Sequence, residues 1–523
     1  MKSMNWSGWG DPDDAMTLPP HLLGLLEQLL GVKSPARRTV DLDEVDLPPS
    51  VLPEEAQEAI AAIVGAENIR TDAAERIAHT RGKSTVDLLR IRGGDAADAP
   101  DAIVAPASHD EILAVLRACA GHRVAVVPFG GGTSVVGGLV AARSGFAGLI
   151  ALDLARLDAL VSVDPVSRIA TLEPGLRGPD AERLLNEQGF TLGHFPQSYE
   201  YATIGGFAAT RSSGQYSAGY GRFDDMVVGL RVATPVGPIT VGRAPRSAAG
   251  PDLRQLFLGS EGTFGVITAV TVRVSPVPTG QAAEGWRFPT FDAGLAAVRR
   301  LAQDGPLPTL LRLSDPDETV VNATISGTEA AGGCVAVVGY QGERALRDRT
   351  RVEEILRSAD GVPLGAEPGE QWLRGRFQAP YLRDALIDAG AIAETIETAA
   401  FWGGLPALYA AVRDALVTSL SAAGTAPLVL CHVSHVYAAG ASLYFTVVCA
   451  STDDPIGQWQ RAKVAANTAI LAAGGTITHH HGVGTDHAPG LAEEVGPLAL
   501  NALRAVKDSL DPQGILNPGV LLG

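Results

Sequence analysis

Residues 128–134, Pro128-Phe129-Gly130-Gly131-Gly132-Thr133-Ser134, decide the fold that this sequence predicts. They follow Val124–Val127, a short apolar run typical of a buried strand, and further glycines come after them at Gly137 and Gly138. Because glycine has no Cβ, neighbouring N–H groups can converge on an anion. The spacing matches neither GxGxxG nor a Walker loop. We therefore expect either a diphosphate cradle of another kind or an ordinary glycine-rich turn.

Two later regions of similar character favour the cradle. Their central segments read Pro196-Gln197-Ser198-Tyr199-Glu200-Tyr201-Ala202, then Ala209-Thr210-Arg211-Ser212, and finally Glu261-Gly262-Thr263-Phe264-Gly265-Val266-Ile267. Each segment alone could be loop chemistry. All of them in one strand-rich region suit a long cofactor that carries phosphates, a ribityl chain and a ring.

The composition limits the kinds of partner. The chain of 523 residues carries 41 Lys and Arg against 58 Asp and Glu, a formal net charge of −17, which disfavours nucleic acid. An anionic substrate would need a local basic pocket. The four cysteines form no CxxC pair, so neither a zinc ribbon nor a dithiol motif is indicated. Since no uncharged apolar run of about 18 residues exists, we expect a cytoplasmic protein.

The pattern of elements divides the chain into four parts. Residues 1–95 predict a helical N-terminal region, and residues 96–278 predict a strand-rich domain that contains the glycine segments. The prolines near residue 277 mark its end, because proline interrupts helices and central strands. Residues 279–475 mix helices with strands that can pair antiparallel, which indicates an α+β substrate or cap domain. Residues 476–523 are too short to fold alone, so they should pack back near the cofactor.

The glycine segments together resemble the flavin-binding signatures of the vanillyl-alcohol oxidase / p-cresol methylhydroxylase (PCMH-type) family. This resemblance implies an α+β fold: a PCMH-type two-subdomain FAD-binding domain, an α+β cap domain and a helical N-terminal region. It also implies FAD, with its diphosphate on Pro128–Ser134 and further contacts from Pro196–Ala202, Ala209–Ser212 and Glu261–Ile267. Some members tether FAD through a histidine in the first loop. This loop has none, so we expect dissociable, non-covalent FAD.

A run of histidines, His479-His480-His481-Gly482-Val483-Gly484, lies near the C-terminus. Neighbouring side chains on a strand point to opposite faces, so the triplet would make an awkward three-ligand zinc site, even with His487 added. We therefore expect no metal here. The run is either a polar cluster over a reactive centre or a solvated loop.

A second motif begins at the last residue of the strand predicted at residues 428–437. It reads Tyr437-Ala438-Ala439-Gly440-Ala441-Ser442-Leu443-Tyr444-Phe445. Together with the histidine run, it resembles the alkyldihydroxyacetonephosphate synthases. Gly8-Trp9-Gly10, Leu311-Arg312-Leu313 and Tyr381-Leu382-Arg383-Asp384 resemble segments of the same family. This second resemblance extends over nearly the whole chain.

Such a family implies an FAD enzyme that works without net redox change. It exchanges the acyl group of acyl-dihydroxyacetone phosphate for a long-chain alcohol and forms an ether lipid precursor. By motif, Tyr437 would abstract a proton from the carbon that bears the acyloxy group, and His479, His480 and His481 would assist. Arg383 would bind the substrate phosphate, and Arg312 would lie near the flavin. Ionising a tyrosine near pH 7 costs roughly 4 kcal/mol, which a nearby Arg or protonated His would reduce.

Two other functions stay open. The tail, residues 510–519, also resembles FAD-dependent 2-hydroxyacid dehydrogenases, which indicates an FAD-linked oxidase or dehydrogenase of a 2-hydroxy acid or small alcohol. The third alternative is a non-catalytic flavin or lipid-phosphate binding protein. The expected partner is therefore a small lipid-phosphate or hydroxy-acid molecule. Peripheral membrane contact and a homodimer are further expectations.

Overall fold

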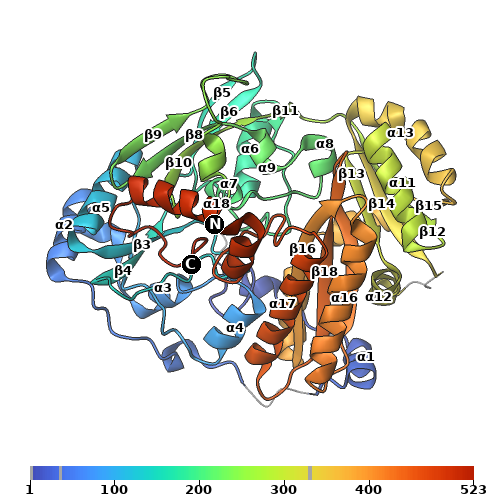
Figure 1. The fold of residues 1–523 in the computed structure, drawn as a ribbon, viewed down its shortest axis with the longest axis horizontal. Coiled ribbons are helices and arrows are strands. Elements are labelled where there is room, and N and C mark those ends of the chain that lie inside the picture. Colours follow the sequence, from blue (N-terminus) through green and yellow to red (C-terminus); the bar gives the residue numbers. More distant parts are fainter. Residues whose placement is uncertain (1–3, 34–37, 328–331) are drawn as a thin grey trace.

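The strands form two groups of sheets that lie side by side, one in each half of the molecule (Figure 1). The computed structural model describes residues 4–33, 38–327 and 332–523. In these ranges the first group holds a four-stranded sheet, a five-stranded sheet and a short two-stranded pair. The second group is one seven-stranded sheet. The glycine segments all belong to the first group, and the histidine run follows the second.

The first glycine loop begins where a central sheet ends. The four-stranded sheet has the order β1-β2-β4-β3 and consists of β1 (Ile69–Arg70), β2 (Ala102–Val104), β3 (Val124–Phe129) and β4 (Gly148–Asp153). β4 pairs in parallel with β2 and β3 and is buried along its whole length, as a central parallel strand should be. Helix α5 (His109–His122) packs on β3 and is capped by the Ser108 hydroxyl. The loop therefore starts at the carboxyl end of β3.

The five-stranded sheet is antiparallel and carries the other glycine segments. Its order is β5 (Leu160–Asp164), β6 (Ile169–Leu172), β10 (Val266–Arg273), β8 (Val227–Thr234) and β9 (Gly237–Val241). Around it lie α6 (Gly178–Glu187), α7 (Ile204–Thr210), α8 (Ser217–Tyr220), α9 (Phe223–Met226), α10 (Arg254–Phe257) and the pair β7 (Phe190–Thr191) with β11 (Ser275–Pro276). The Glu261 N–H donates to the Ala209 carbonyl at 3.0 Å. This bond joins the segment after α7 to the one before β10.

The seven-stranded sheet forms the core of the second half. Its order is β15 (Val362–Gly365), β12 (Gln281–Phe288), β14 (Cys334–Gln341), β13 (Leu310–Ser314), β17 (Leu428–Val436), β18 (Gly440–Ala450) and β16 (Ala391–Phe401). The helices of this half are α11 (Phe291–Asp304), α12 (Pro316–Ser326), α13 (Gly342–Arg357), α14 (Glu367–Gly375), α15 (Ala379–Asp388), α16 (Leu405–Ala422) and α17 (Pro455–Ala472). Neighbouring strands pair antiparallel, which agrees with the α+β character expected for residues 279–475.

The sequence does not predict β16, the strand at one edge of this sheet. Its residues, Ala391-Ile392-Ala393-Glu394-Thr395-Ile396-Glu397-Thr398-Ala399-Ala400-Phe401, include alanines and two glutamates, residue types that favour helices. Eleven register pairs with β18 outweigh that local preference. Both glutamates are buried, which makes them candidates for a role inside the molecule.

The two ends of the chain pack against these sheets. The N-terminal region contains η1 (Pro12–Asp14), α1 (Pro20–Leu30), η2 (Leu42–Glu44), α2 (Glu54–Val64), η3 (Ala66–Asn68), α3 (Ala73–Ala78) and α4 (Thr85–Arg92). After α18 (Ala488–Leu510), the tail runs beside β3, where Val126 N–H donates to Ile515 O at 2.8 Å and Asn517 N–H to Val126 O at 2.9 Å. The end of the tail thus packs on the four-stranded sheet, and the expected position of residues 476–523 near the cofactor stays a prediction. The predicted boundaries at residues 95, 278 and 475 stay a prediction.

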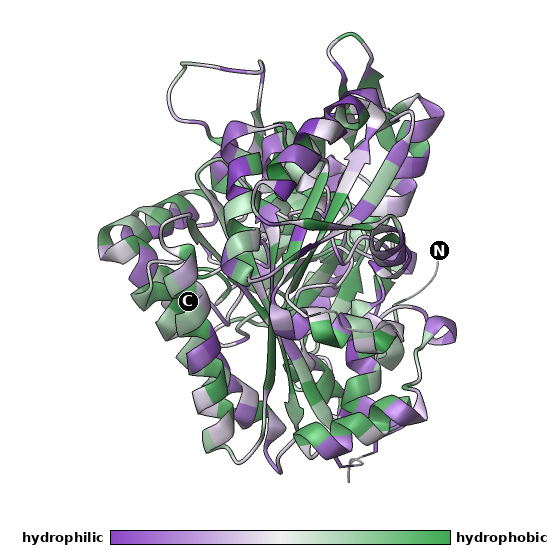
Figure 2. Cartoon of the chain, turned by 90° about the vertical axis from the view of Figure 1, so that its right-hand side faces the viewer, coloured by the Kyte–Doolittle hydropathy of each residue, from purple (hydrophilic) through white to green (hydrophobic). Residues whose placement is uncertain are grey.

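Hydrophobic residues concentrate on the interior strands, and many of the outer helices carry hydrophilic residues as well (Figure 2). The largest cluster of buried side chains lies between the seven-stranded sheet and its helices. Among the described residues, no helix combines the length and the apolar character that crossing a bilayer requires.

Candidate active site

The glycine segments pack so closely that side chains would not fit. A Cβ on Gly131 would stand 2.1 Å from the Tyr201 carbonyl oxygen, and one on Gly262 would stand 2.8 Å from Pro128 Cγ. Gly132 has φ +67°, a left-handed conformation that strains other residues. The glycines are therefore required to bring the first loop against the second and third segments.

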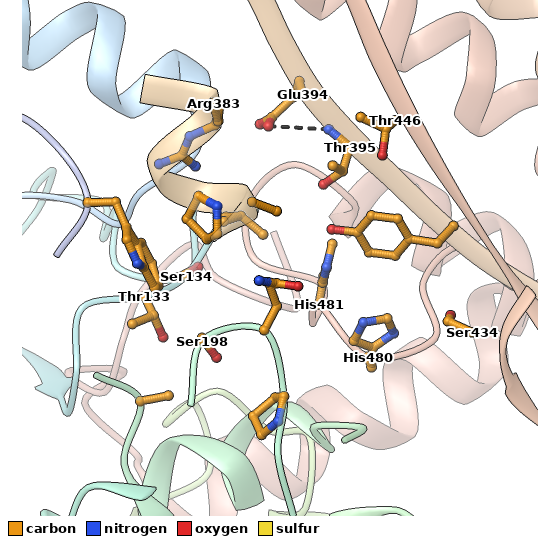
Figure 3. A pocket seen from close by; sticks show the side chains of 18 of the residues that line it. Thr133, Ser134, Ser198, Arg383, Glu394, Thr395, Ser434, Thr446, His480 and His481 are labelled. Carbon is orange, nitrogen blue, oxygen red and sulfur yellow. Dashed lines mark hydrogen bonds between the residues drawn. The ribbon is translucent and has the colours of Figure 1, made fainter. Parts of the chain in front are cut away.

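These segments line one cavity of about 790 Å³ that extends between the two groups of sheets. The first loop contributes all of Pro128–Ser134, and the other predicted segments contribute Pro196, Gln197, Ser198, Ala202, Ala209, Thr210, Ser212, Glu261, Gly262, Gly265, Val266 and Ile267. In the view of Figure 3, Thr133, Ser134 and Ser198 lie on one side of the pocket and Ser434, His480 and His481 on the other.

Six residues of the predicted cofactor set do not line this cavity. They are Tyr199, Glu200, Tyr201, Arg211, Thr263 and Phe264. Each has another contact: Tyr199 stacks on Phe377, Tyr201 meets Trp9 edge-on, and Glu200 accepts a bond from the Tyr381 hydroxyl. Arg211 donates to the Leu258 carbonyl, Thr263 donates to the Val520 carbonyl, and Phe264 is buried in the core. Their side chains support the loops from outside.

The cavity fits an elongated polar cofactor. Its walls carry buried side-chain atoms without a hydrogen-bond partner in the described structure, among them Gln197 Nε2 and Gln215 Oε1. Such atoms are costly unless a ligand or water bonds to them. Together with the glycine loop at the end of β3, they suit the phosphates and ring of FAD. The residues that would hold it are those of the first loop, with Gln197 and Ser198.

Both predicted arginines line the cavity, and each is already hydrogen-bonded. Arg312 on β13 donates to the ring of His432 at 2.9 Å and to Glu318 Oε1 at 2.9 Å. Burial would raise the pKa of Glu318, but Arg312 and His432 hold it at about 2, so this carboxylate stays charged. Arg383 on α15 bonds to the Lys83 carbonyl and to Asp384 Oδ1. These contacts orient the two guanidinium groups along the cavity wall.

The histidine run meets Tyr437 at the end of β17. The Tyr437 hydroxyl and His479 Nε2 lie 2.8 Å apart, and His479 Nδ1 and His480 Nδ1 lie 3.0 Å apart. His480 and His481 line the cavity, whereas Tyr437 and His479 lie directly behind that wall. The structure thus brings Tyr437, His479 and His480 into one hydrogen-bonded group beside the cavity, with the ring of His481 packed edge-on against that of His480.

The charge that favours ionisation of Tyr437 comes from an arginine, and the histidines beside the phenol do not supply it. Burial raises the pKa of Tyr437 to about 12, while the Arg222 guanidinium and the Ser213 hydroxyl act in the opposite direction. Burial also holds the pKa of His479 well below its usual value, with His480 and Arg222 adding to the effect. The cation near the phenol is therefore Arg222, which the sequence did not single out. Tyr437 starts as a neutral phenol beside a neutral imidazole.

His435 lies next to the triplet. One ring nitrogen each of His435, His479 and His480 can be chosen so that all lie within 4.8 Å of one another, a spacing that a metal ion would accept. The sequence did not point to His435. These nitrogens have hydrogen-bond partners in the structure, because His435 Nδ1 meets Ser217 Oγ at 2.8 Å and both nitrogens of His479 are used. The expectation of no metal stays a prediction.

Two buried carboxylates that belong to different halves of the molecule hold the histidine run. Glu397 on β16 accepts the backbone N–H groups of residues 479–481. Glu261 accepts those of Val483 and Gly484, and burial raises its pKa to about 7 despite these bonds. Glu261 was expected at the cofactor, and it lines the cavity while clamping this loop. Glu397 was not foreseen, since no strand was predicted there.

One arm of the cavity is apolar. It is lined by Leu18, Leu22, Leu25, Leu26, Leu29 and Leu30 in and before α1, by Val320, Val321 and Ile325 of α12, by Leu382 and Leu386 of α15, and by Leu428, Leu430 and Val448 of β17 and β18. α1 contains no fully buried residue, and Leu29 keeps 66% of its surface exposed. The arm can therefore accommodate a long hydrocarbon chain beside the polar site.

Family models match the two halves of the chain. Residues 100–242 match the FAD binding domain, and residues 277–521 match the C-terminal domain of FAD linked oxidases. p-Cresol methylhydroxylase has the same fold, with a TM-score of 0.69 over 91% of this chain and 98% of its own, at 16% identity. The fold and site thus define an FAD-linked enzyme with a PCMH-type FAD-binding domain, which confirms the α+β fold class predicted from sequence.

More similar relatives narrow the class. The chain is 31% identical to the alkyldihydroxyacetonephosphate synthases of Dictyostelium discoideum and Trypanosoma brucei brucei, over 100% of this chain and 94% and 92% of theirs. A solved alkyldihydroxyacetonephosphate synthase matches with a TM-score of 0.85 at 28% identity, over 99% of this chain and 98% of that one. The chain belongs to the alkyldihydroxyacetonephosphate synthase-like family of FAD-linked oxidases.

Proposed function

We propose that this protein exchanges the acyl group of acyl-dihydroxyacetone phosphate for a long-chain alcohol, as the names of its relatives suggest. The observation that carries the proposal is the meeting of three features at one cavity: two arginines and an apolar arm line it, and the Tyr437–His479 pair adjoins its wall through His480, whose Nδ1 lies 3.0 Å from His479 Nδ1. A small 2-hydroxy acid is too short to fill that apolar arm.

The arginines would bind the polar end of the substrate. Arg383 presents a planar guanidinium that suits a phosphate, and its bond to Asp384 keeps it oriented. Arg312 lies on β13, inside the seven-stranded sheet, where His432 and Glu318 hold its guanidinium group. A phosphate at Arg383 would place the chain of the substrate towards α1 and α12, which line the apolar arm.

Tyr437 and His479 would move the proton. Because the pKa of Tyr437 is raised to about 12, a free phenolate is costly near neutral pH. Tyr437 would instead take the proton of the substrate carbon while its own proton passes to His479 Nε2, 2.8 Å away. The C–H electron pair stays on carbon, the phenol is regenerated, and His479 becomes the cation. FAD, when bound, would supply an electrophilic ring that accepts this carbon without net redox change.

FAD is proposed to bind without a covalent link, since the first loop offers no histidine. Acid precipitation should leave colourless protein and a yellow supernatant. Colour that stays with the precipitated chain would contradict this assignment.

The direct experiment supplies purified holoenzyme with acyl-dihydroxyacetone phosphate and a long-chain alcohol, and measures released fatty acid and ether product. Both should appear in equal amounts. Failure to release fatty acid would contradict the proposal. Bleaching of the flavin by a 2-hydroxy acid without ether product would support the oxidoreductase alternative. A protein named as a glycolate oxidase subunit, from Bacillus subtilis, is 28% identical to this chain.

Exposed apolar side chains next to the arm indicate where a lipid would enter it. Leu23 and Leu29 of α1 and Val320 and Ile325 of α12 are large apolar side chains that remain exposed. Peripheral membrane contact through this surface is part of the proposal. A homodimer stays an expectation from the family.

A further inference from the structure

Glu397 has an unusual set of partners for a buried carboxylate. Its side chain is only 3% exposed, and it lies on β16, behind the histidine run. Oε1 accepts bonds from the Thr478 hydroxyl at 2.6 Å and from the N–H groups of His480 at 3.1 Å and His481 at 3.0 Å. Oε2 accepts from His479 N–H at 2.7 Å. Four donors from four consecutive residues therefore converge on one group.

The same carboxylate is the counter-charge nearest to the histidine rings. Oε2 lies 3.4 Å from His480 Nδ1, which in turn meets His479 Nδ1 at 3.0 Å. Burial alone would raise the pKa of Glu397, but His480, His481 and His479 hold it well below its usual value. The contacts thus run from the Tyr437 hydroxyl through the rings of His479 and His480 to a buried anion, the Glu397 carboxylate.

We propose that Glu397 is the positioning residue of this site, which fixes the histidine backbone and supplies the negative charge that stabilises His479 when it receives the proton of Tyr437. The inference rests on the proposed role of the Tyr437–His479 pair. A carboxylate that orients a histidine and stabilises its cation is the physical arrangement found behind other catalytic histidines. It explains why Glu397 occurs in a strand that is otherwise largely apolar and buried.

The main test compares Glu397→Gln with wild type. The amide keeps one acceptor oxygen and turns an N–H₂ group towards donors, and it carries no charge. We expect kcat to fall about 10- to 100-fold, with FAD content and KM close to wild type. Glu284→Gln is the matched control, because Glu284 is buried in the same sheet, accepts from Trp286 and Tyr340, and does not line the cavity. It should lower the melting temperature and leave kcat unchanged.

Two more variants separate the effect of the Glu397 charge from the effect of its hydrogen bonds to residues 478–481. Thr478→Val removes one of the four bonds and keeps the charge, so its kcat should stay near wild type. Glu397→Asp keeps the charge on a shorter side chain and should give an intermediate kcat. It also carries the test if the glutamine variant does not fold. A glutamine variant with wild-type kcat would overturn the proposal, and so would an aspartate variant that lost as much kcat as the glutamine variant, because the charge would then have no effect.

A spectroscopic measurement does not depend on the reaction. In ¹⁵N-histidine spectra of the holoenzyme, with His479 assigned through His479→Gln, wild type should show a neutral ring with one protonated nitrogen. Glu397→Gln should shift both ring-nitrogen resonances of His479. Unchanged resonances would overturn the role of Glu397 even if the ether-forming activity is real. Shifted resonances in a protein without that activity would instead count against the proposed function alone.

Discussion

The reactive end of the cavity is closed by hydrogen bonds between distant segments, whereas the apolar arm is lined by side chains with few polar contacts. At the reactive end, Tyr437, His479, His480 and Glu397 form a continuous network. In the arm, α1 packs Leu26 and Leu30 against α15 and the seven-stranded sheet, while others of its leucines remain exposed. The difference shows that the chemistry depends on hydrogen bonds and charge, whereas binding of the chain depends on apolar contact. Substitutions at the reactive end should therefore lower kcat, and substitutions in the arm should raise KM.

Tyr437→Phe should have the largest effect. Removing the hydroxyl removes the group that takes the substrate proton, so kcat should fall about 10²- to 10⁴-fold while FAD stays bound. Tyr444→Phe is the matched comparison, since Tyr444 lines the cavity and stacks on His432. It should lose much less in a steady-state assay. If Tyr444→Phe abolished turnover and Tyr437→Phe did not, the base would be Tyr444.

Arg383→Lys should chiefly weaken binding. Lysine cannot reproduce the planar fork, and a charged hydrogen bond is worth about 1.5–3 kcal/mol, so KM should rise about 10- to 100-fold with a smaller change in kcat. Initial rates over a range of substrate concentrations give both values. Arg374→Lys on the exposed side of α14 is the control. A loss of FAD from Arg383→Lys would mean that this arginine belongs to the cofactor site.

Substitutions in the arm should act through chain length. Leu26→Gln places a polar group where Leu26 lines the cavity, so KM for a long-chain alcohol should rise several-fold and KM for a short one should not. The control is Leu498→Gln, because Leu498 on α18 is exposed, does not line the cavity and lies outside the surface proposed for lipid entry. Equal effects on long and short alcohols would contradict an apolar arm that binds the chain.

The smallest effect concerns stability and pH. Since burial raises the pKa of Glu261 to about 7, the folded state binds its proton more tightly than the unfolded state does. The stability from this group is full below its unfolded pKa and is lost as pH rises through about 7. From about pH 5 to about pH 8, wild type should therefore lose on the order of 1–3 °C in melting temperature relative to Glu261→Gln. A pH-independent difference would show that Glu261 does not titrate in the folded protein.

The sequence predicted the cofactor end of the site better than the reactive end. The glycine loop is a local signal, because close packing at Gly131 and the turn at Gly132 both require glycine. The C-terminal segment, residues 476–523, was expected to pack back near the cofactor; its last residues run beside β3, and the position near the cofactor stays a prediction. Tyr437 and the histidine run were recognisable by motif, yet their hydrogen bond joins residues 42 positions apart, which no spacing shows.

Residues that act through tertiary contacts escaped prediction for a physical reason. Glu397 lies in a segment whose alanines and glutamates favour a helix, and only pairing with β18 makes it a strand. Arg222 lies before a one-turn helix and looks like a surface residue until the fold places it near Tyr437. Tyr199 and Phe264 sit inside predicted cofactor segments, but they turn into aromatic and core contacts.

One measurement tests the central claim most directly: an anaerobic absorbance titration of the holoenzyme with acyl-dihydroxyacetone phosphate and a long-chain alcohol, with the products quantified in the same cuvette. The account predicts equal amounts of fatty acid and ether lipid over many turnovers, with the oxidised flavin spectrum restored once the substrate is consumed. Permanent bleaching in proportion to substrate, with no ether formed, would contradict it.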